Sequence, residues 1–377
     1  MIDYTKPEGS YISFMSNKVK TFGGINFAQG IPGFQPPIEL ISKLKENADK
    51  NLHQYAPGNG NKELLDLLLK KYNKQYQFSL DNFLILQGAT EALTLLFIYF
   101  NKIIKTPFST LAFDPVYESY KHLPKIFGSK FIPFSFNEDA KVDYEKLEQT
   151  CISNNVKVIF LSSPGNPYGK IWTKQEIGNL IKISIKHKIF IVLDAVYREL
   201  YFEEEPYIPL DKFNEYLFYT NSFSKILSIT GWRIGYLIAH KKHMDAIKSI
   251  HDYTGLCAAT VLQQSIVDYL KESDFGKQYI SKLRKQLAYS YKKISNELIK
   301  IGFVIPETKG GYFVWAKLPD KFSDGFKFAI DLYEDQKLAV IPGEHFSDKC
   351  SNFIRINIAR PDDEINQGIS KLKAFCK

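Results

Sequence analysis

Short apolar runs alternate with amphipathic stretches between about residue 80 and residue 240. Each run is four to six residues long, and a polar residue or a glycine follows it within a few positions. Runs that are apolar at every position are typical of strands in a parallel sheet that helices cover on both faces. The pattern therefore predicts an α/β fold with a mostly parallel sheet, whose strands include residues 83–87, 110–113, 156–161, 189–193 and 216–220.

The stretches between these strands have the period of helices. One helix is predicted near Ala89, and another opens with Thr173 and Glu176, which have the spacing of a capping box. Beyond residue 245 the pattern changes to a long helical region, about 245–300, followed by short strands and helices. We therefore expect a smaller α+β domain there. The predicted division is an N-terminal arm that joins the small domain (1–38), a large domain (39–260) and a small C-terminal domain (261–377).

Polar residues and glycines gather just after the strands of the large domain. In open α/β sheets, ligands bind in the crevice at the carboxyl ends of the strands. The residues that follow different strands should therefore converge on one site. This site is predicted to contain Gly88, Asn166, Asp194, Ser222 and Lys225.

Composition and charge narrow the possible functions. The net charge is +8, but the lysines are scattered without a dense basic block, so a solvated surface explains them better than a nucleic-acid site. The four cysteines form no C-x-x-C pair, and His240 and His243 have no evident third ligand, so we expect neither disulfides nor a metal site. The longest apolar run, "LTLLFIYF", is too short to cross a bilayer, and the first residues do not resemble a signal peptide. We expect a cytoplasmic protein without a membrane partner.

The segment "SFSKILSITGWRIG" places Lys225 and Arg233 among small and apolar residues. Two cations in such a segment either extend their charged ends to solvent, pair with an anion or take part in chemistry, because an unpaired buried ammonium is costly. A phosphorylated aromatic aldehyde in the crevice would give each polar group a task. Lys225 would form a Schiff base with the aldehyde, and Asp194 would pair with a protonated ring nitrogen. The remaining contacts would come from Arg233, Ser222, Ala89 and Thr90 to the phosphate, Asn166 and Tyr197 to a ring hydroxyl, and Tyr117 to the ring face.

Eight segments, in order along the chain, resemble those of fold-type I pyridoxal-phosphate-dependent aminotransferases of class I. The likeness extends over almost the whole chain and is strongest to the subgroup of kynurenine, glutamine and methionine transaminases. The segments are "FAQGIPGFQPP", "QYAPGNGNKELLDLL", "GATEAL", "FDPVYESY", "SSPGNPYGKIWTKQEI", "LDAVYREL", "SFSKILSITGWRIG" and "FIRINIA".

The resemblance implies a role for each matching residue. It implies that Lys225, Asp194 and Tyr197 are catalytic, that pyridoxal 5'-phosphate is the cofactor, and that a homodimer shares its active sites through Tyr55, which reaches the neighbouring subunit's phosphate. The implied cofactor contacts are Ala89, Thr90, Tyr117, Asn166, Asp194, Tyr197, Ser222, Lys225 and Arg233, and the implied substrate contacts are Gly30, Asn166 and Arg355. Two positions depart from the family pattern: Tyr168 stands where threonine is usual, and Ala195 where glutamate is common.

Several functions remain open at this level. Transfer of an amino group from an amino acid to a 2-oxo acid by a ping-pong mechanism is expected, and a carbon–sulfur β-lyase on the same cofactor is the main alternative. A transcription regulator of the same fold would need a DNA-binding domain, for which the first 35 residues or so are too few, and a decayed binding protein would not keep both the lysine and the aspartate. No second arginine matches a dicarboxylate substrate. Tyr11, Phe34 and Phe346 are expected to form an apolar pocket for a neutral, sulfur-containing or aromatic side chain.

Overall fold

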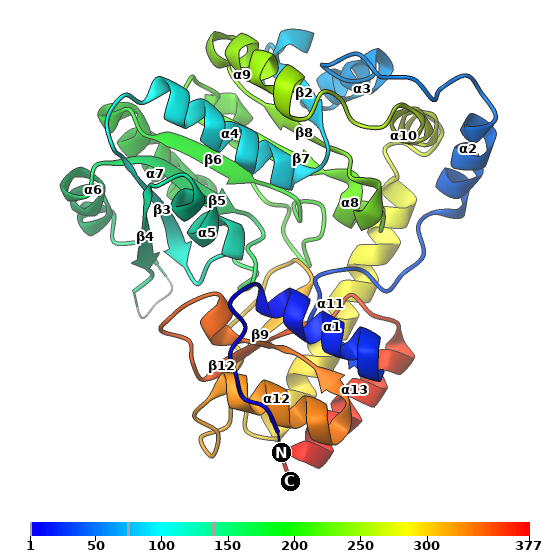
Figure 1. Ribbon diagram of the computed structural model, residues 1–377, viewed down its shortest axis with the longest axis vertical. Helices are drawn as coiled ribbons and strands as arrows, with labels where there is room; N and C mark the ends of the chain where they lie inside the picture. The colour runs from blue at the N-terminus through cyan, green and yellow to red at the C-terminus, as the bar shows by residue number, and fades with distance from the viewer. Residues whose placement is uncertain (1, 74–75, 138–140) are drawn as a thin grey trace.

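A computed structural model describes residues 2–73, 76–137 and 141–377. Its centre is a seven-stranded sheet with the order β2-β8-β7-β6-β5-β3-β4 (Figure 1). All neighbouring pairs are parallel except those that involve β8, which is antiparallel to β2 and β7. The α/β prediction with a mostly parallel sheet is therefore confirmed. The strands are β2 (Phe83–Leu86), β3 (Ser109–Asp114), β4 (Lys130–Ser135), β5 (Val156–Ser162), β6 (Phe190–Asp194), β7 (Leu217–Ser222) and β8 (Gly235–Ile238).

Alternate side chains of the central strands supply two separate cores. In β2, Leu84 and Leu86 face the cluster that contains residues of α4 and α9, whereas Phe83 and Ile85 face the cluster on the other side of the sheet. Because both faces are covered, the strands are apolar at every position. The helices of this part are α2 (Ile38–Ala48), α3 (Lys62–Tyr72), α4 (Ala89–Ile103), α5 (Glu118–Ile126), α6 (Tyr144–Ser153), α7 (Lys174–His187), α8 (Phe223–Ile226), α9 (Lys241–Thr254) and α10 (Thr260–Glu272).

A second, smaller layer contains the end of the chain and its beginning. Its antiparallel sheet has the order β11-β12-β9, and β1 pairs in parallel with β10. The N-terminal helix α1, blue in Figure 1, lies against β1, β10 and β11. The elements are α1 (Tyr11–Phe22), β1 (Ile25–Asn26), α11 (Lys277–Lys300), β9 (Phe313–Lys317), α12 (Gly325–Gln336), β10 (Leu338–Ala339), β11 (Ile341–Pro342), β12 (Phe353–Asn357) and α13 (Asp362–Phe375).

The long helical region predicted at 245–300 consists of three helices, α9, α10 and α11. Left-handed backbone separates them, with φ of 61° at Leu256 before α10 and 73° at Gly276 before α11. α10 packs on α2 and α3, and the domain boundary at 260/261 stays a prediction. Four short 3₁₀ helices complete the described chain: η1 (Leu80–Asn82), η2 (Pro209–Lys212), η3 (Thr230–Trp232) and η4 (Gly343–His345). Within the described residues, no helix combines the length and apolar character that crossing a bilayer requires.

Candidate active site

A cavity of about 250 Å³ lies at the carboxyl ends of β5, β6 and β7. It is bounded on its other side by residues of the N-terminal segment and of the small antiparallel sheet. Polar groups from five or more separate segments therefore face one space, as the strand-end pattern predicts. The predicted site residues that line it are Gly30, Ala89, Thr90, Tyr117, Asn166, Asp194, Tyr197, Ser222, Lys225, Arg233 and Arg355.

Asp194 ends β6 with its carboxylate held by two donors. Tyr120 Oη donates to Oδ2 at 2.8 Å, and the backbone N–H of Val196 donates to Oδ1 at 3.2 Å. The side chain is 5% exposed, and this burial raises the pKa of Asp194 to about 6, although the two hydrogen bonds and Lys225 oppose the rise. A positively charged ring nitrogen beside it would relieve this cost. The geometry therefore fits a pyridinium partner.

Lys225 lies in α8, three residues after the end of β7. Its ammonium donates to the carbonyl oxygen of Gly30 and lies 5.8 Å from the ring centroids of both Tyr197 and Tyr312. Burial, followed by the positive charges of Arg355 and Arg233, lowers the pKa of Lys225 to about 8. A lysine with this pKa has a substantial neutral fraction near pH 8, so it can act as a nucleophile or as a base.

Two glycines make room for Arg233 beside the N-terminus of α4. Gly88, the N-cap of α4, has a φ of 91°, and a Cβ there would lie 2.6 Å from Arg233 Nη2. A Cβ on Gly235 would lie 2.8 Å from the backbone of Gly88. The guanidinium therefore sits close to the first N–H groups of a helix, at Ala89 and Thr90. A guanidinium together with a helix N-terminus is a suitable site for a phosphate group.

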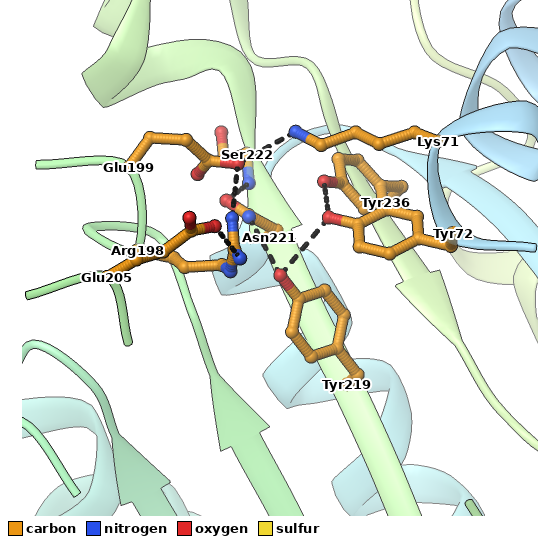
Figure 2. A network of polar contacts seen from close by, with 9 residues as sticks. All are labelled: Lys71, Tyr72, Arg198, Glu199, Glu205, Tyr219, Asn221, Ser222 and Tyr236. Carbon is orange, nitrogen blue, oxygen red and sulfur yellow. Dashed lines mark hydrogen bonds and ion pairs between the residues drawn. The ribbon is translucent and has the colours of Figure 1, made fainter. Parts of the chain in front are cut away.

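A buried polar cluster lies behind the segment that leads to Lys225 (Figure 2). Asn221 Oδ1 accepts the backbone N–H of Ser222 at 2.7 Å, which leaves Asn221 Nδ2 to donate to Tyr219 Oη at 3.1 Å. Tyr219 Oη is 3.2 Å from Tyr72 Oη, and Tyr72 Oη is 2.7 Å from Tyr236 Oη. Ser222 Oγ in turn accepts the N–H of Ser224 as the N-cap of α8. The cluster fixes the backbone that carries Lys225.

The same cluster extends to charged residues at its outer edge. Figure 2 shows that both Lys71 and Arg198 contact Glu199, with Lys71 Nζ 2.7 Å and Arg198 Nη1 3.3 Å from Glu199 Oε1. The two cations lower the pKa of Glu199 to about 2, although burial alone would raise it. Glu199 is therefore ionised in this cluster at neutral pH.

Arg355 is fully buried in β12, and it has no anionic partner in the part of the chain that the structure describes. Its Nη1 donates to Asn166 Oδ1 at 2.9 Å and its Nη2 to the carbonyl oxygen of Ala28 at 2.6 Å, while its Nε has no hydrogen-bond partner. The guanidinium lies 4.0 Å from the ring centroid of Phe313 and 4.8 Å from that of Phe346. Among the described residues, no carboxylate is within ion-pair distance. A bound carboxylate would compensate this buried charge.

Asn166 connects this arginine to the cofactor side of the cavity. Arginine has only donors, so the atom of Asn166 that faces Arg355 must be the oxygen. Its amide nitrogen then remains available to donate to a ring oxygen, as the resemblance implies. In that arrangement, one side chain would contribute to both groups of contacts.

The structure does not bring every predicted residue to the cavity. Tyr55 is 82% exposed and lies outside it, so its role across a subunit boundary stays a prediction. The structure describes Tyr11, Phe34 and Phe346, but none of them lines the cavity. The prediction that these three residues form the apolar pocket was therefore wrong. Ile12 and Ile31 face the cavity instead.

Sequence reasoning missed three residues that shape the site: Glu118, Tyr120 and Tyr312. Tyr120 follows Tyr117 by three positions at the start of α5, a helical spacing that places both side chains on one face. That spacing was a usable signal. The hydroxyl of Tyr312 donates to the carbonyl oxygen of Lys225. No comparable signal points to Tyr312, because it lies 87 residues from Lys225 in the sequence.

Comparison with protein families gives the identity of the fold and its chemistry. The family model "Aminotransferase class I and II" matches residues 23–372. The chain belongs to this family. It is a fold-type I aminotransferase of class I, and its cofactor is pyridoxal phosphate.

Individual relatives are distant but extend over the whole fold. A probable aspartate aminotransferase of Methanocaldococcus jannaschii is 29% identical over 93% of this chain and 92% of its own length. The solved aspartate aminotransferase of Thermus thermophilus with maleate has a TM-score of 0.89 at 20% identity, covering 98% of this chain and 97% of that one. A putative kynurenine aminotransferase of Saccharomyces cerevisiae, Bna3p, has a TM-score of 0.84 at 21% identity and covers 97% and 94%. At these identities the solved structures show the fold, and the resemblance to the kynurenine, glutamine and methionine subgroup is not confirmed.

Proposed function

We propose that this transaminase moves the amino group of a neutral, sulfur-containing or aromatic amino acid to a 2-oxo acid by a ping-pong mechanism. The observation that carries the proposal is Arg355, a buried guanidinium without a carboxylate partner in the same cavity as Lys225 and Asp194. An α-carboxylate is the group that amino acids and 2-oxo acids share. One arginine can therefore receive each of them in turn, which supports the ping-pong scheme.

The residues of the cavity fit pyridoxal phosphate in three places. Arg233 and the N-terminus of α4 would hold its phosphate, Asp194 its ring nitrogen, and Asn166 with Tyr197 its ring oxygen. When bound, the cofactor supplies an electron sink for the electron pair released at the substrate's Cα. Lys225 Nζ then removes the Cα proton and later returns a proton, a role that its pKa of about 8 suits.

Burial keeps these groups in position while the proton moves. Tyr120 and Val196 fix the Asp194 carboxylate, and the cluster behind Ser222 fixes the backbone before Lys225. Such preorganisation reduces the reorientation needed during the reaction.

The side chain of the substrate is proposed to be neutral. The cations that line the described cavity are Lys225, Arg233 and Arg355, and the first two have cofactor tasks. Arg355 is then left for the α-carboxylate, and no further cation remains for a second one. Several relatives are named aspartate aminotransferases, and on this point we propose that the present chain differs.

A homodimer with shared sites is also part of the proposal. Tyr55 is 82% exposed, and the neighbouring segment exposes Tyr253 at 91% and Leu256 at 45%. The two segments adjoin, because a Cβ on Gly58 would lie 2.9 Å from Asp252 Oδ1. A second copy of the chain would cover these aromatic and apolar groups and place Tyr55 at its phosphate site. The four cysteines are unpaired, which supports a role in the reducing cytoplasm.

Two measurements test the proposal. Borohydride reduction of the cofactor-loaded enzyme followed by peptide mapping should label Lys225, and a label on another lysine would reject its role. A panel of amino acids assayed with several 2-oxo acids should give new amino acids only when both substrates are present. Pyruvate and ammonia from a cysteine conjugate, without any oxo acid, would favour the β-lyase instead.

A further inference from the structure

The cavity contains a carboxylate that the cofactor contacts do not use. Glu118 is the first residue of α5, next to Tyr117, and lines the same cavity as Arg355. His345 Nε2 lies 3.0 Å from Glu118 Oε2, and the His345 ring is 4% exposed and stacked on Tyr11 at 5.5 Å. Glu118 is therefore held in place from outside the cavity by residues of η4 and α1.

This carboxylate is ionised at neutral pH. Burial alone would raise the pKa of Glu118, but the neighbouring His345, with further help from Ser10 and Arg355, lowers it below the usual range. An ionised carboxylate accepts hydrogen bonds and donates none. A group that approaches it must therefore be apolar, a hydrogen-bond donor or a cation.

The substrate's side chain has few directions open to it. Its carboxylate is assigned to Arg355 and its Cα to Lys225, while Asp194, Arg233 and their neighbours face the cofactor. The lining that remains includes the apolar residues Ile12, Ile31 and Phe313, the neutral residue Gln29 and the carboxylate of Glu118. A side chain that leaves the reaction centre therefore meets apolar groups, the neutral Gln29 and one carboxylate.

We propose that Glu118 makes this site select against side chains that end in a carboxylate and accept those that end in an apolar or hydrogen-donating group. The proposal rests on the proposed function for the placement of the substrate's carboxylate at Arg355. Its chemical basis is repulsion between like charges in a partly buried space, where water screens them incompletely. Glu118 is thus a residue that determines specificity.

Binding of three acids with the same five-carbon chain tests this directly. Pentanoate, glutarate and 5-aminopentanoate differ only at C5, which is a methyl group, a carboxylate or a CH2 group that carries an ammonium. Calorimetry on the cofactor-loaded wild-type enzyme should find glutarate the weakest of the three, by about tenfold relative to pentanoate, a factor that corresponds to about 1.4 kcal/mol. Glutarate binding as tightly as pentanoate would overturn the proposal without any variant.

The variant Glu118→Gln removes the charge and keeps the shape. It should bind glutarate about tenfold more tightly relative to pentanoate and 5-aminopentanoate more weakly. Glu344→Gln is the matched control, because Glu344 lies in the same cluster, accepting from Tyr11 Oη at 2.9 Å and from Lys6 Nζ at 2.7 Å, but does not line the cavity. The same change in both variants, or no change in Glu118→Gln, would overturn the proposal.

Turnover separates this inference from the proposed function. Relative kcat/KM for aspartate over methionine should rise about tenfold in Glu118→Gln and stay constant in Glu344→Gln. If the wild-type enzyme transaminates no amino acid of the panel, the proposed function fails, yet the order of the three acids still decides the role of Glu118. If turnover occurs but the ratio does not change, the proposed function stands and the role of Glu118 is wrong.

Discussion

Replacing Asp194 by asparagine should stabilise the apoprotein at alkaline pH while it disables the enzyme. The ionised carboxylate is buried at 5% exposure, and its two donors, Tyr120 and the Val196 N–H, do not fully offset the lost solvation. Asparagine has nearly the same shape and no charge. The folded protein therefore no longer has to bury an anion.

The size of the effect follows from the pKa. Burial raises the pKa of Asp194 from 3.8 to about 6, and each pKa unit corresponds to about 1.4 kcal/mol. Because the folded-state pKa is the higher one, the contribution of Asp194 to stability is greatest below pH 4 and is lost as the pH rises through 6. The loss amounts to roughly 3 kcal/mol at pH 8. Asparagine carries no charge and so avoids this loss. It has only one oxygen, however, so one of the two donors loses its acceptor, which costs about 1 kcal/mol.

Urea denaturation of both apoproteins at pH 4 and pH 8 measures this difference. Asp194→Asn should be more stable than the wild type by about 2 kcal/mol at pH 8, and the advantage should disappear by pH 4. The loaded variant should nevertheless lose transamination by about a hundredfold or more, because a neutral amide cannot hold a protonated ring nitrogen. A variant that is less stable than the wild type by the same amount at both pH values would refute the reasoning.

Three further outcomes are expected. Arg355→Lys should lower kcat/KM for the amino acid and the oxo acid alike, by about tenfold to more than a hundredfold, with normal cofactor content, and a loss confined to one substrate would contradict its role. Asn221→Leu leaves the Ser222 N–H without its acceptor, so the free energy of unfolding should fall by about 1–3 kcal/mol in denaturant titrations, whereas an unchanged midpoint would show the bond to be dispensable. Mixing Lys225→Ala subunits with Tyr55→Phe subunits should restore part of the activity in verified mixed dimers, and no recovery would make Tyr55 a local residue.

Residues on the large sheet were predictable because the sequence encodes both their strand and their place at its end. Asp194 follows its apolar run directly, Lys225 lies three residues after the end of β7, and parallel strands end at the same edge. Arg355 was found through its resemblance to the family segment and through its isolation in an apolar strand. These signals are local, because the residues that make up each of them lie within about ten positions of the sequence.

The parts that were not predicted depend on contacts between distant segments. Glu118 is recognisable as part of the site only once His345 lies beside it. Ile12 faces the cavity in a helix, α1, that packs against β10 and β11, and the loop of Ile31 is held by Asn357 of β12, which donates to the Ile31 carbonyl oxygen. The edge strand β4 has only Phe134 buried, and Pro133 interrupts its apolar residues, so it lacks the continuous apolar run of its neighbours. Local patterns carry no information about such approaches.

The contacts of Arg355 also set an order of events during synthesis. Its two bonded partners, Ala28 and Asn166, precede it by 327 and 189 residues, whereas all strands of the large sheet lie within residues 83–238. A ribosome therefore releases all strands of the large sheet before Arg355, the residue proposed to receive the substrate, has been translated. Contacts of such long sequence separation form late and slowly in folding. The growing chain can thus acquire its cofactor at a stage when it is still unable to take up an amino acid.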